Sequence, residues 1–165
     1  MTTQAPDSCT FDGRKWVIEH WEGPQDCVPT NEQLGFRTVS PSTANWSGRI
    51  DHFLIHRGQL FLFKVEVTLD PADTGVLPFG ARREIVLRYE HWEVHDDRGM
   101  RMEERERRTE YLVFDDLPMS FTGALHVSYP WFDHWELPWP ISEQDEETTE
   151  QLILAFVDGY LMPRV

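Results

Sequence analysis

Alternation of apolar and polar residues with a period of two dominates the chain and predicts β-strands. The clearest segment has two strand-like runs, Trp46–Ile55 and Leu60–Leu69, on either side of the turn Arg57-Gly58. This pattern predicts a β-hairpin. In the second run one set of alternate positions is wholly apolar, and we expect it to face the core: Phe61, Phe63, Val65 and Val67.

Further strands are expected over residues 15–21, 84–95, 121–129 and 151–157, the last followed by the turn Asp158-Gly159. The charged segment Met100–Glu110 is open to two interpretations. It either returns along 84–95 as a solvent-facing hairpin, or forms a helix whose Glu and Arg residues pair three or four positions apart. We favour the hairpin. Residues 22–45 and 70–81 are rich in Gly, Pro, Ser or Asp and predict loops.

These elements predict a single domain over residues 1–165 that is mainly β, an antiparallel sandwich or small barrel with little helix. Residues 1–13 are polar and are expected to be loosely held. The longest apolar runs are only a few residues, far short of the roughly 20 needed to cross a bilayer, so no membrane contact is predicted. The first residues lack the basic start and apolar core of a signal peptide, and a cytoplasmic location is expected.

Charge changes the picture of possible partners. The chain carries 29 acidic and 15 basic residues, a net charge of −14, and 19 of the acidic residues lie in 83–165. A surface with this much negative charge repels phosphate backbones and gains no free energy from counterion release. Nucleic-acid binding is therefore not expected. A basic protein partner is favoured instead, although acidity also serves solubility alone. The oligomeric state stays open.

One short motif, an acidic residue followed by His, Trp and Glu, occurs three times: Glu19-His20-Trp21-Glu22, Glu90-His91-Trp92-Glu93 and Asp133-His134-Trp135-Glu136. Imidazole and carboxylate are common ligands of divalent metal ions. His20, His91 and His134 are therefore weak candidate metal ligands. Their spacing is irregular, and chance together with the preference of Trp for strands is the simpler interpretation. We predict no cofactor.

The densest aromatic segment runs from Tyr129 to Pro140. Its Trp131, Trp135 and Trp139, together with Trp92, are candidates for binding a ligand or a partner, because Trp combines a large apolar surface with one polar group. A small barrel with an aromatic mouth would suit an apolar ligand. The alternative is that this segment closes one end of the sheet as core.

Motifs of nucleophilic and nucleotide-dependent catalysis are absent from the sequence. It contains no Gly-x-Ser-x-Gly elbow and no glycine-rich phosphate loop. Cys9 and Cys27 lie in no motif that activates a thiolate, and both are expected to be free thiols. Catalytic residues are not identified, and the chain is not expected to be an enzyme.

Two stretches resemble a group of small bacterial β-rich proteins of uncharacterised function. The first joins 42–50 to 55–62 and is similar to that group's Trp-x-Gly strand and hairpin. The second joins 121–127 to 152–161 and is similar to its Phe-Thr-Gly-x-Leu strand and closing turn. The chain departs from the pattern in a charged insertion over about 70–117 and at Asn45 and Arg49. The resemblance implies a β-rich fold and no particular activity.

Taken together, the sequence favours a non-enzymatic binding module. An acidic, immunity-like or regulatory protein that recognises a basic partner is the leading hypothesis. A binder of an apolar small molecule among the aromatic residues is the second hypothesis. A metal-dependent enzyme that uses His and Glu residues is the third.

Overall fold

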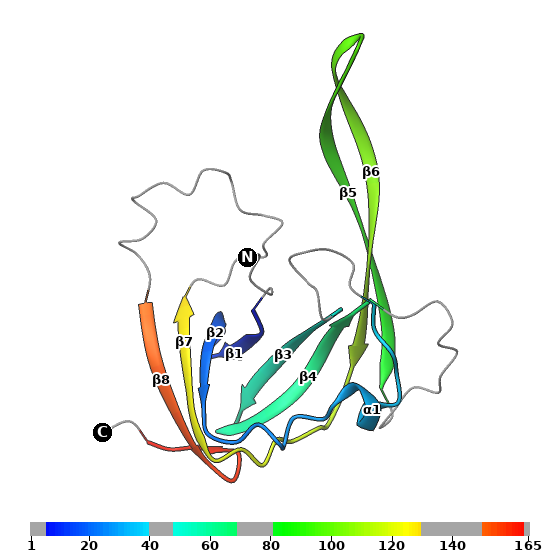
Figure 1. Ribbon diagram of the computed structural model, residues 1–165. Helices are drawn as coiled ribbons and strands as arrows, with labels where there is room; N and C mark the ends of the chain where they lie inside the picture. The colour runs from blue at the N-terminus through cyan, green and yellow to red at the C-terminus, as the bar shows by residue number, and fades with distance from the viewer. Residues whose placement is uncertain (1–5, 40–47, 69–80, 130–149, 164–165) are drawn as a thin grey trace.

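The computed structural model describes residues 6–39, 48–68, 81–129 and 150–163, and within them nine strands form one sheet. Figure 1 shows a curved body from which one hairpin projects. The elements are β1 (Ser8–Phe11), β2 (Arg14–Glu22), α1 (Asn31–Leu34), β3 (Arg49–His56), β4 (Gln59–Val67), β5 (Arg82–Asp96), β6 (Gly99–Val113), β7 (Gly123–Tyr129), β8 (Glu150–Val157) and β9 (Tyr160–Leu161).

Seven of these strands close into a barrel in the order β3-β1-β2-β7-β8-β9-β4, and β4 then pairs with β3. The expected mainly β fold is confirmed, and of the two architectures the barrel is the correct one. One detail is wrong: β1 and β3 run parallel, with Ser8 opposite His52 and Cys9 opposite Phe53. The strands β6 and β5 extend the sheet from the outer edge of β4.

Tight turns set the register of the hairpins. Arg57 and Gly58 have φ values of 50° and 76°, and Asp158 and Gly159 have values of 48° and 82°. Two consecutive residues with positive φ are typical of the type I′ turn, whose twist matches that of the two strands it joins. The predicted Arg57-Gly58 and Asp158-Gly159 turns are therefore confirmed. The hairpin over 84–110 is confirmed as well, since β5 and β6 pair along their whole length.

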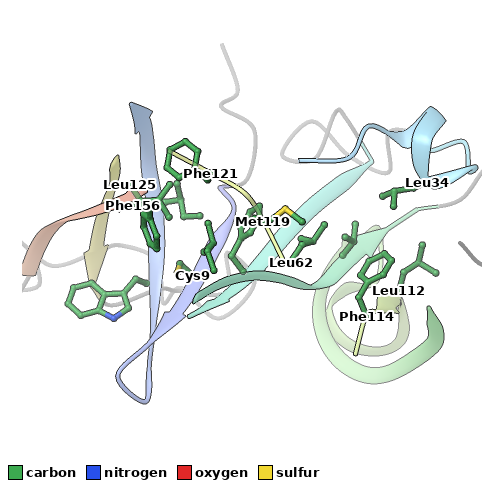
Figure 2. Packing of buried hydrophobic residues seen from close by; sticks show 14 of the residues in the cluster. Cys9, Leu34, Leu62, Leu112, Phe114, Met119, Phe121, Leu125 and Phe156 are labelled. Atoms are coloured by element: carbon green, nitrogen blue, oxygen red, sulfur yellow. The ribbon is translucent and has the colours of Figure 1, made fainter. Parts of the chain in front are cut away.

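The barrel interior is filled by apolar side chains from every barrel strand except the short β9, whose Leu161 packs against the edge of this core. Figure 2 shows a continuous row that runs from Leu125 and Phe156, past Cys9 and Leu62, to Phe114. Leu34 of α1 has no exposed surface and extends this row at one end. The short helix thus positions one apolar side chain on the core.

The core face of β4 differs from the expected one because the strand contains an irregularity. Leu62 lies opposite Phe53 and Lys64 lies opposite His52, so Phe63 has no partner on β3. This extra residue shifts the alternation, as a β-bulge does. Phe61 and Phe63 are consequently only half-buried, and the buried positions of β4 are Leu60, Leu62, Val65 and Val67.

The N-terminal segment also differs from expectation. Residues 1–13 were predicted to be loose, but Ser8–Phe11 form β1, and Ser8 and Cys9 are completely buried. The hydrophobic pattern did not indicate this strand because it contains polar residues. Ser8 is buried through a hydrogen bond to His52 and not through apolar packing. The loop expected over 22–45 contains α1, and residues 40–45 of it lie outside the described part.

Gly159 and Gly58 offer a matched test of turn packing. Both have positive φ, but an added Cβ at Gly58 meets nothing within 4 Å, whereas at Gly159 it overlaps the carbonyl oxygen of Met119. We expect Gly58→Ala to cost about 1 kcal/mol from left-handed strain alone. Gly159→Ala should cost about 2 kcal/mol more, because the backbone must also move. Urea denaturation of both variants measures this difference, and equal losses would contradict the close approach.

Candidate functional site

The hairpin of β5 and β6 projects from the barrel as a two-stranded ribbon, here called the arm (Figure 1). Next to the barrel, β6 pairs with β4 over four positions, from Val113 to Glu110. Beyond that point eleven cross-strand pairs, from Val86–Thr109 to Asp96–Gly99, have no third strand among the described residues. At about 3.4 Å per residue the free ribbon is about 35 Å long.

The two strands are in register, so the arm has two distinct faces. One of them, here called the acidic face, takes every second residue of each strand. Its charged residues are four glutamates and one arginine, and the remaining positions are apolar or histidine. The members are Ile85, Leu87, Tyr89, His91, Glu93 and His95 of β5 and Met100, Met102, Glu104, Glu106, Arg108 and Glu110 of β6.

The acidic face carries five large apolar side chains that remain between 45% and 61% exposed: Ile85, Leu87, Tyr89, Met100 and Met102. Isolated two-stranded ribbons are marginally stable in water, and apolar side chains gathered on one exposed face mark an interaction surface. Glu110 is paired with Arg83 and Arg108 at 2.7 and 3.2 Å. Farther out, Glu93 and Glu104 lie 2.9 and 4.0 Å from the Nε2 atoms of His95 and His91. This part of the face has three glutamates and two histidines, and no arginine.

Trp92, a candidate from the sequence, lies on the opposite face of the arm. Its indole N–H donates to Glu90 at 3.2 Å, and the Arg105 guanidinium lies 5.4 Å from its ring centre. Arg105 in turn donates to Glu103 at 2.9 Å. The polar side chains of this face thus largely form hydrogen bonds and ion pairs with one another. We therefore regard this face as less suited than the acidic face to bind a partner.

The other candidates form no site among the described residues. Trp131, Trp135, Trp139 and His134 lie outside the described residues. His20 is on β2 and His91 is on β5, two strands that do not pair with each other. Within the described part of the chain, no three His, Cys, Asp or Glu side chains are grouped so as to hold a metal ion.

Three ionisable residues meet where the start of β3 lies beside the segment before β1; Asp51 is buried, and Asp7 and Arg49 are partly buried. The Arg49 guanidinium donates two hydrogen bonds to the Asp51 carboxylate, at 2.6 and 2.9 Å, and one to the carbonyl of Pro29 at 2.8 Å. The Asp7 carboxyl accepts the backbone N–H of Asp51 at 2.8 Å. Burial and the neighbouring Asp51 carboxylate raise the pKa of Asp7 to about 7. This network fixes the loop before α1 and the N-terminus to β3.

A serine and a histidine form a second buried polar contact, in which Ser8 Oγ and His52 Nδ1 are 2.6 Å apart. A hydroxyl hydrogen-bonded to imidazole is the arrangement of an activated nucleophile. Ser8, however, has no exposed surface and His52 has 4%. Burial, with smaller effects from Lys15 and Lys64, lowers the pKa of His52 to about 3, so the imidazole is neutral. The geometry supports a role in joining β1 to β3.

Both cysteines are free, as expected. Cys9 is buried inside the barrel, and burial raises the pKa of its thiol to about 12. Cys27 is partly buried, which also raises the pKa of its thiol. Both thiols are therefore protonated at neutral pH, and a protonated thiol is a poor nucleophile and a poor metal ligand.

The exposed apolar residues of the acidic face were missed by the candidate residues chosen from the sequence. Their signal was nevertheless present, because Ile85, Leu87 and Tyr89 alternate with polar residues and the predicted partner segment has Met100 and Met102 at matching positions. Such alternation normally predicts one face against a core. Only the structure places this face on an arm away from the barrel.

Comparison with known proteins gives no family for the chain: no family model, no curated protein sequence and no solved structure matches it. Within the described residues, no helix is long and apolar enough to cross a membrane. The resemblance to a group of small bacterial β-rich proteins stays a prediction. Part of the stretch that carries it, residues 42–47, lies outside the described part.

Asp7→Asn tests the buried network through pH. In the native protein Asp7 keeps its proton up to a pH of about 7, whereas in the unfolded chain it releases it near 3.8. The native state binds more protons within this window, so its stability falls as pH rises from about 4 to above 7. The amide of the variant still accepts the Asp51 N–H and does not titrate. The stability of Asp7→Asn relative to wild type should rise over this range in urea denaturation. A constant difference between pH 4.5 and 8 would contradict the assignment.

Shortening the arm tests whether it supports the barrel. The pair Val86–Thr109 can be joined by Asn-Gly in place of residues 87–108, because this dipeptide forms the two-residue turn that hairpins prefer. No residue that this change removes belongs to the buried core. We expect the free energy of unfolding to change by less than about 1 kcal/mol. A loss of several kcal/mol in urea denaturation would show that the arm belongs to the cooperative core.

Proposed function

We propose that the protein is a non-enzymatic binding module that recognises a basic protein partner through the acidic face of its arm. The observation that carries this proposal is that five exposed apolar side chains share one face of a ribbon with four glutamates and only one arginine. The apolar side chains supply the area that is buried on association, since burial of apolar surface is the main driving force of protein association. The arm then works as a preformed recognition element.

Charge defines the partner. Glu104 and Glu106 lie on the acidic face beside exposed Tyr89 and Met102, and the whole chain has a net charge of −14. A partner with Lys or Arg around an apolar patch is attracted over a distance and then fits the face, whereas an acidic partner is repelled. A second copy of this chain carries the same negative charge and is disfavoured for the same reason. An immunity-like or regulatory role against a basic protein is one form of this proposal.

The proposal includes a cytoplasmic location. Its support is the presence of two free thiols, Cys9 and Cys27, in a chain without a disulfide among its described residues. Thiols stay reduced in that compartment.

Two double variants with the same change in net charge test the assignment. Glu104→Lys with Glu106→Lys reverses two charges on the acidic face. Glu90→Lys with Glu103→Lys reverses two on the opposite face. The probe is a fluorescein-labelled peptide of alternating Lys and Val, and a peptide of alternating Lys and Gly serves as its apolar-free control. Fluorescence anisotropy at low and physiological salt measures the affinities.

We expect the Lys-Val peptide to bind wild type more tightly than the Lys-Gly peptide, and more weakly as salt rises. The acidic-face variant should lose at least about tenfold in affinity, and the opposite-face variant less than about threefold, because only the first removes attraction at the site. Equal losses in both variants would indicate attraction by net charge alone and overturn the proposal. Equal binding of the two peptides would do so as well.

A further inference from the structure

A pocket of about 440 Å³ lies on the outside of the barrel where the arm begins, between β3, β4, the first residues of β5 and the segment after β6. This volume is within the range of small-molecule sites. Most of its wall is apolar and comes from six side chains: Leu54, Phe61, Phe63, Val113, Phe114 and Leu117. The pocket is thus separate from the acidic face, none of whose members lines it and most of which lies on the projecting part of the arm.

The irregularity in β4 builds one wall of this pocket. In a regular strand two consecutive side chains point to opposite faces of the sheet. Here Phe63 and Lys64 follow one another and both line the pocket, because Phe63 is the extra residue that has no partner on β3. The Phe63 carbonyl accepts the backbone N–H of Phe114 at 2.8 Å, which fixes the opposite wall to the same point. The bulge thereby places a cation directly beside an aromatic surface.

Lys64 is the uncompensated charge of the pocket. Its ammonium nitrogen lies 3.8 Å from the centre of the Tyr111 ring, and no carboxylate oxygen of the described residues lies within 4.0 Å of it. Arg82, the second cation of the pocket, is paired with Asp115 at 3.0 Å and with Glu84 at 3.4 Å. The chain has almost twice as many acidic as basic residues, yet this lysine at an apolar pocket has no carboxylate beside it in the described part of the chain. Its ammonium group is therefore suited to bind the anionic group of a ligand.

The strand register gives the geometry for such an anion. Lys64, Val113 and Arg82 lie directly opposite one another across β4, β6 and β5. An acidic group bound to Lys64 therefore lies over Val113, and the apolar body attached to it extends over Phe61 and Phe63. Glu84 and Asp115 also line the pocket, and these two carboxylates outnumber the Arg82 guanidinium between them. They repel any further negative charge, so a polyphosphate or a nucleotide is disfavoured.

We propose that this pocket binds a small amphiphile with one carboxylate and an apolar body, held by an ion pair to Lys64 and by contact with the phenylalanine wall. One cation without a carboxylate partner among the described residues fits one negative charge, and a pocket of about 440 Å³ with an apolar wall fits the apolar body of a small molecule. The site does not depend on the acidic face or on its partner. It therefore adds a small-molecule activity to the proposed binding module.

Two dyes with the same anilinonaphthalene body test the proposal. 8-Anilinonaphthalene-1-sulfonate carries one negative charge, and N-phenyl-1-naphthylamine carries none. Titration of each dye against wild type, Lys64→Met and Lys64→Arg separates the charge from the apolar contact. Decanoate is the competitor, and decyltrimethylammonium is the control with the opposite charge. Circular dichroism confirms that each variant is folded.

We expect decanoate to displace the anionic dye and decyltrimethylammonium to leave it bound. Lys64→Met should weaken the anionic dye by about tenfold, because it removes a charge-assisted contact, and should change the neutral dye by less than about twofold. Lys64→Arg should retain binding of the anionic dye. If Lys64→Met weakens both dyes equally, or neither of them, the proposed ion pair is overturned.

The only other lysine, Lys15, provides an internal control that needs no substitution. Acetylation by sulfosuccinimidyl acetate, followed by mass spectrometry of peptides, reports the reaction rate at each lysine of the wild-type protein. Decanoate should slow acetylation of Lys64 several-fold and leave Lys15 unchanged. Equal rates at Lys64 with and without decanoate would overturn the site even if the Lys64 variants failed to fold.

Discussion

Closure of the sheet through β3 is the constraint on which the remaining structure depends. This strand pairs with β1 along one edge and with β4 along the other, so the barrel has no free edge at this point. The outer edge of β4 is also divided, between β6, the segment around Pro118 and β9. The hairpin of β5 and β6 therefore attaches over four positions only, and its greater part has to project.

Closure also explains why polar residues are buried at one end of the barrel. A parallel pair of strands needs a connection that brings the chain back to the end where the first strand began. Here β2 makes this return as the antiparallel neighbour of β1, and residues 23–39, which include α1, follow it. Arg49 holds this return path through Asp51 and the Pro29 carbonyl, and Asp7 holds the N-terminus to the same strand. These charges fix where the chain enters the barrel.

The extent to which the sequence predicts the structure follows from which interactions are local. Alternation and the turns Arg57-Gly58 and Asp158-Gly159 predict most strands, because backbone preferences within a few residues decide them. The prediction for the core face of β4 was wrong because Phe63 is an extra residue in the pairing of β4 with β3. No local sequence pattern contains that pairing. β1 was missed for a similar reason, since Ser8 is buried only when His52 lies beside it.

The candidate site divides in the same way. The apolar alternation of the arm is visible in the sequence, and so is the excess of acidic residues. That the barrel closes without this hairpin, and so leaves its apolar face uncovered by the other described strands, is a property of the whole topology. The pocket at the arm's base likewise depends on a bulge and on residues from four separate segments.

The narrow attachment of the arm has a mechanical consequence. The ribbon is about 35 Å long and pairs with the barrel over only four residue pairs, so a small rotation at its base is amplified at its tip. A rotation of about 10° moves the tip by about 6 Å. The base of the arm, where it pairs with β4, also forms part of the pocket, through Arg82, Val113 and Lys64. A molecule that fills the pocket would therefore restrict the angles through which the arm sweeps, and so decide how large a volume the tip searches for its partner.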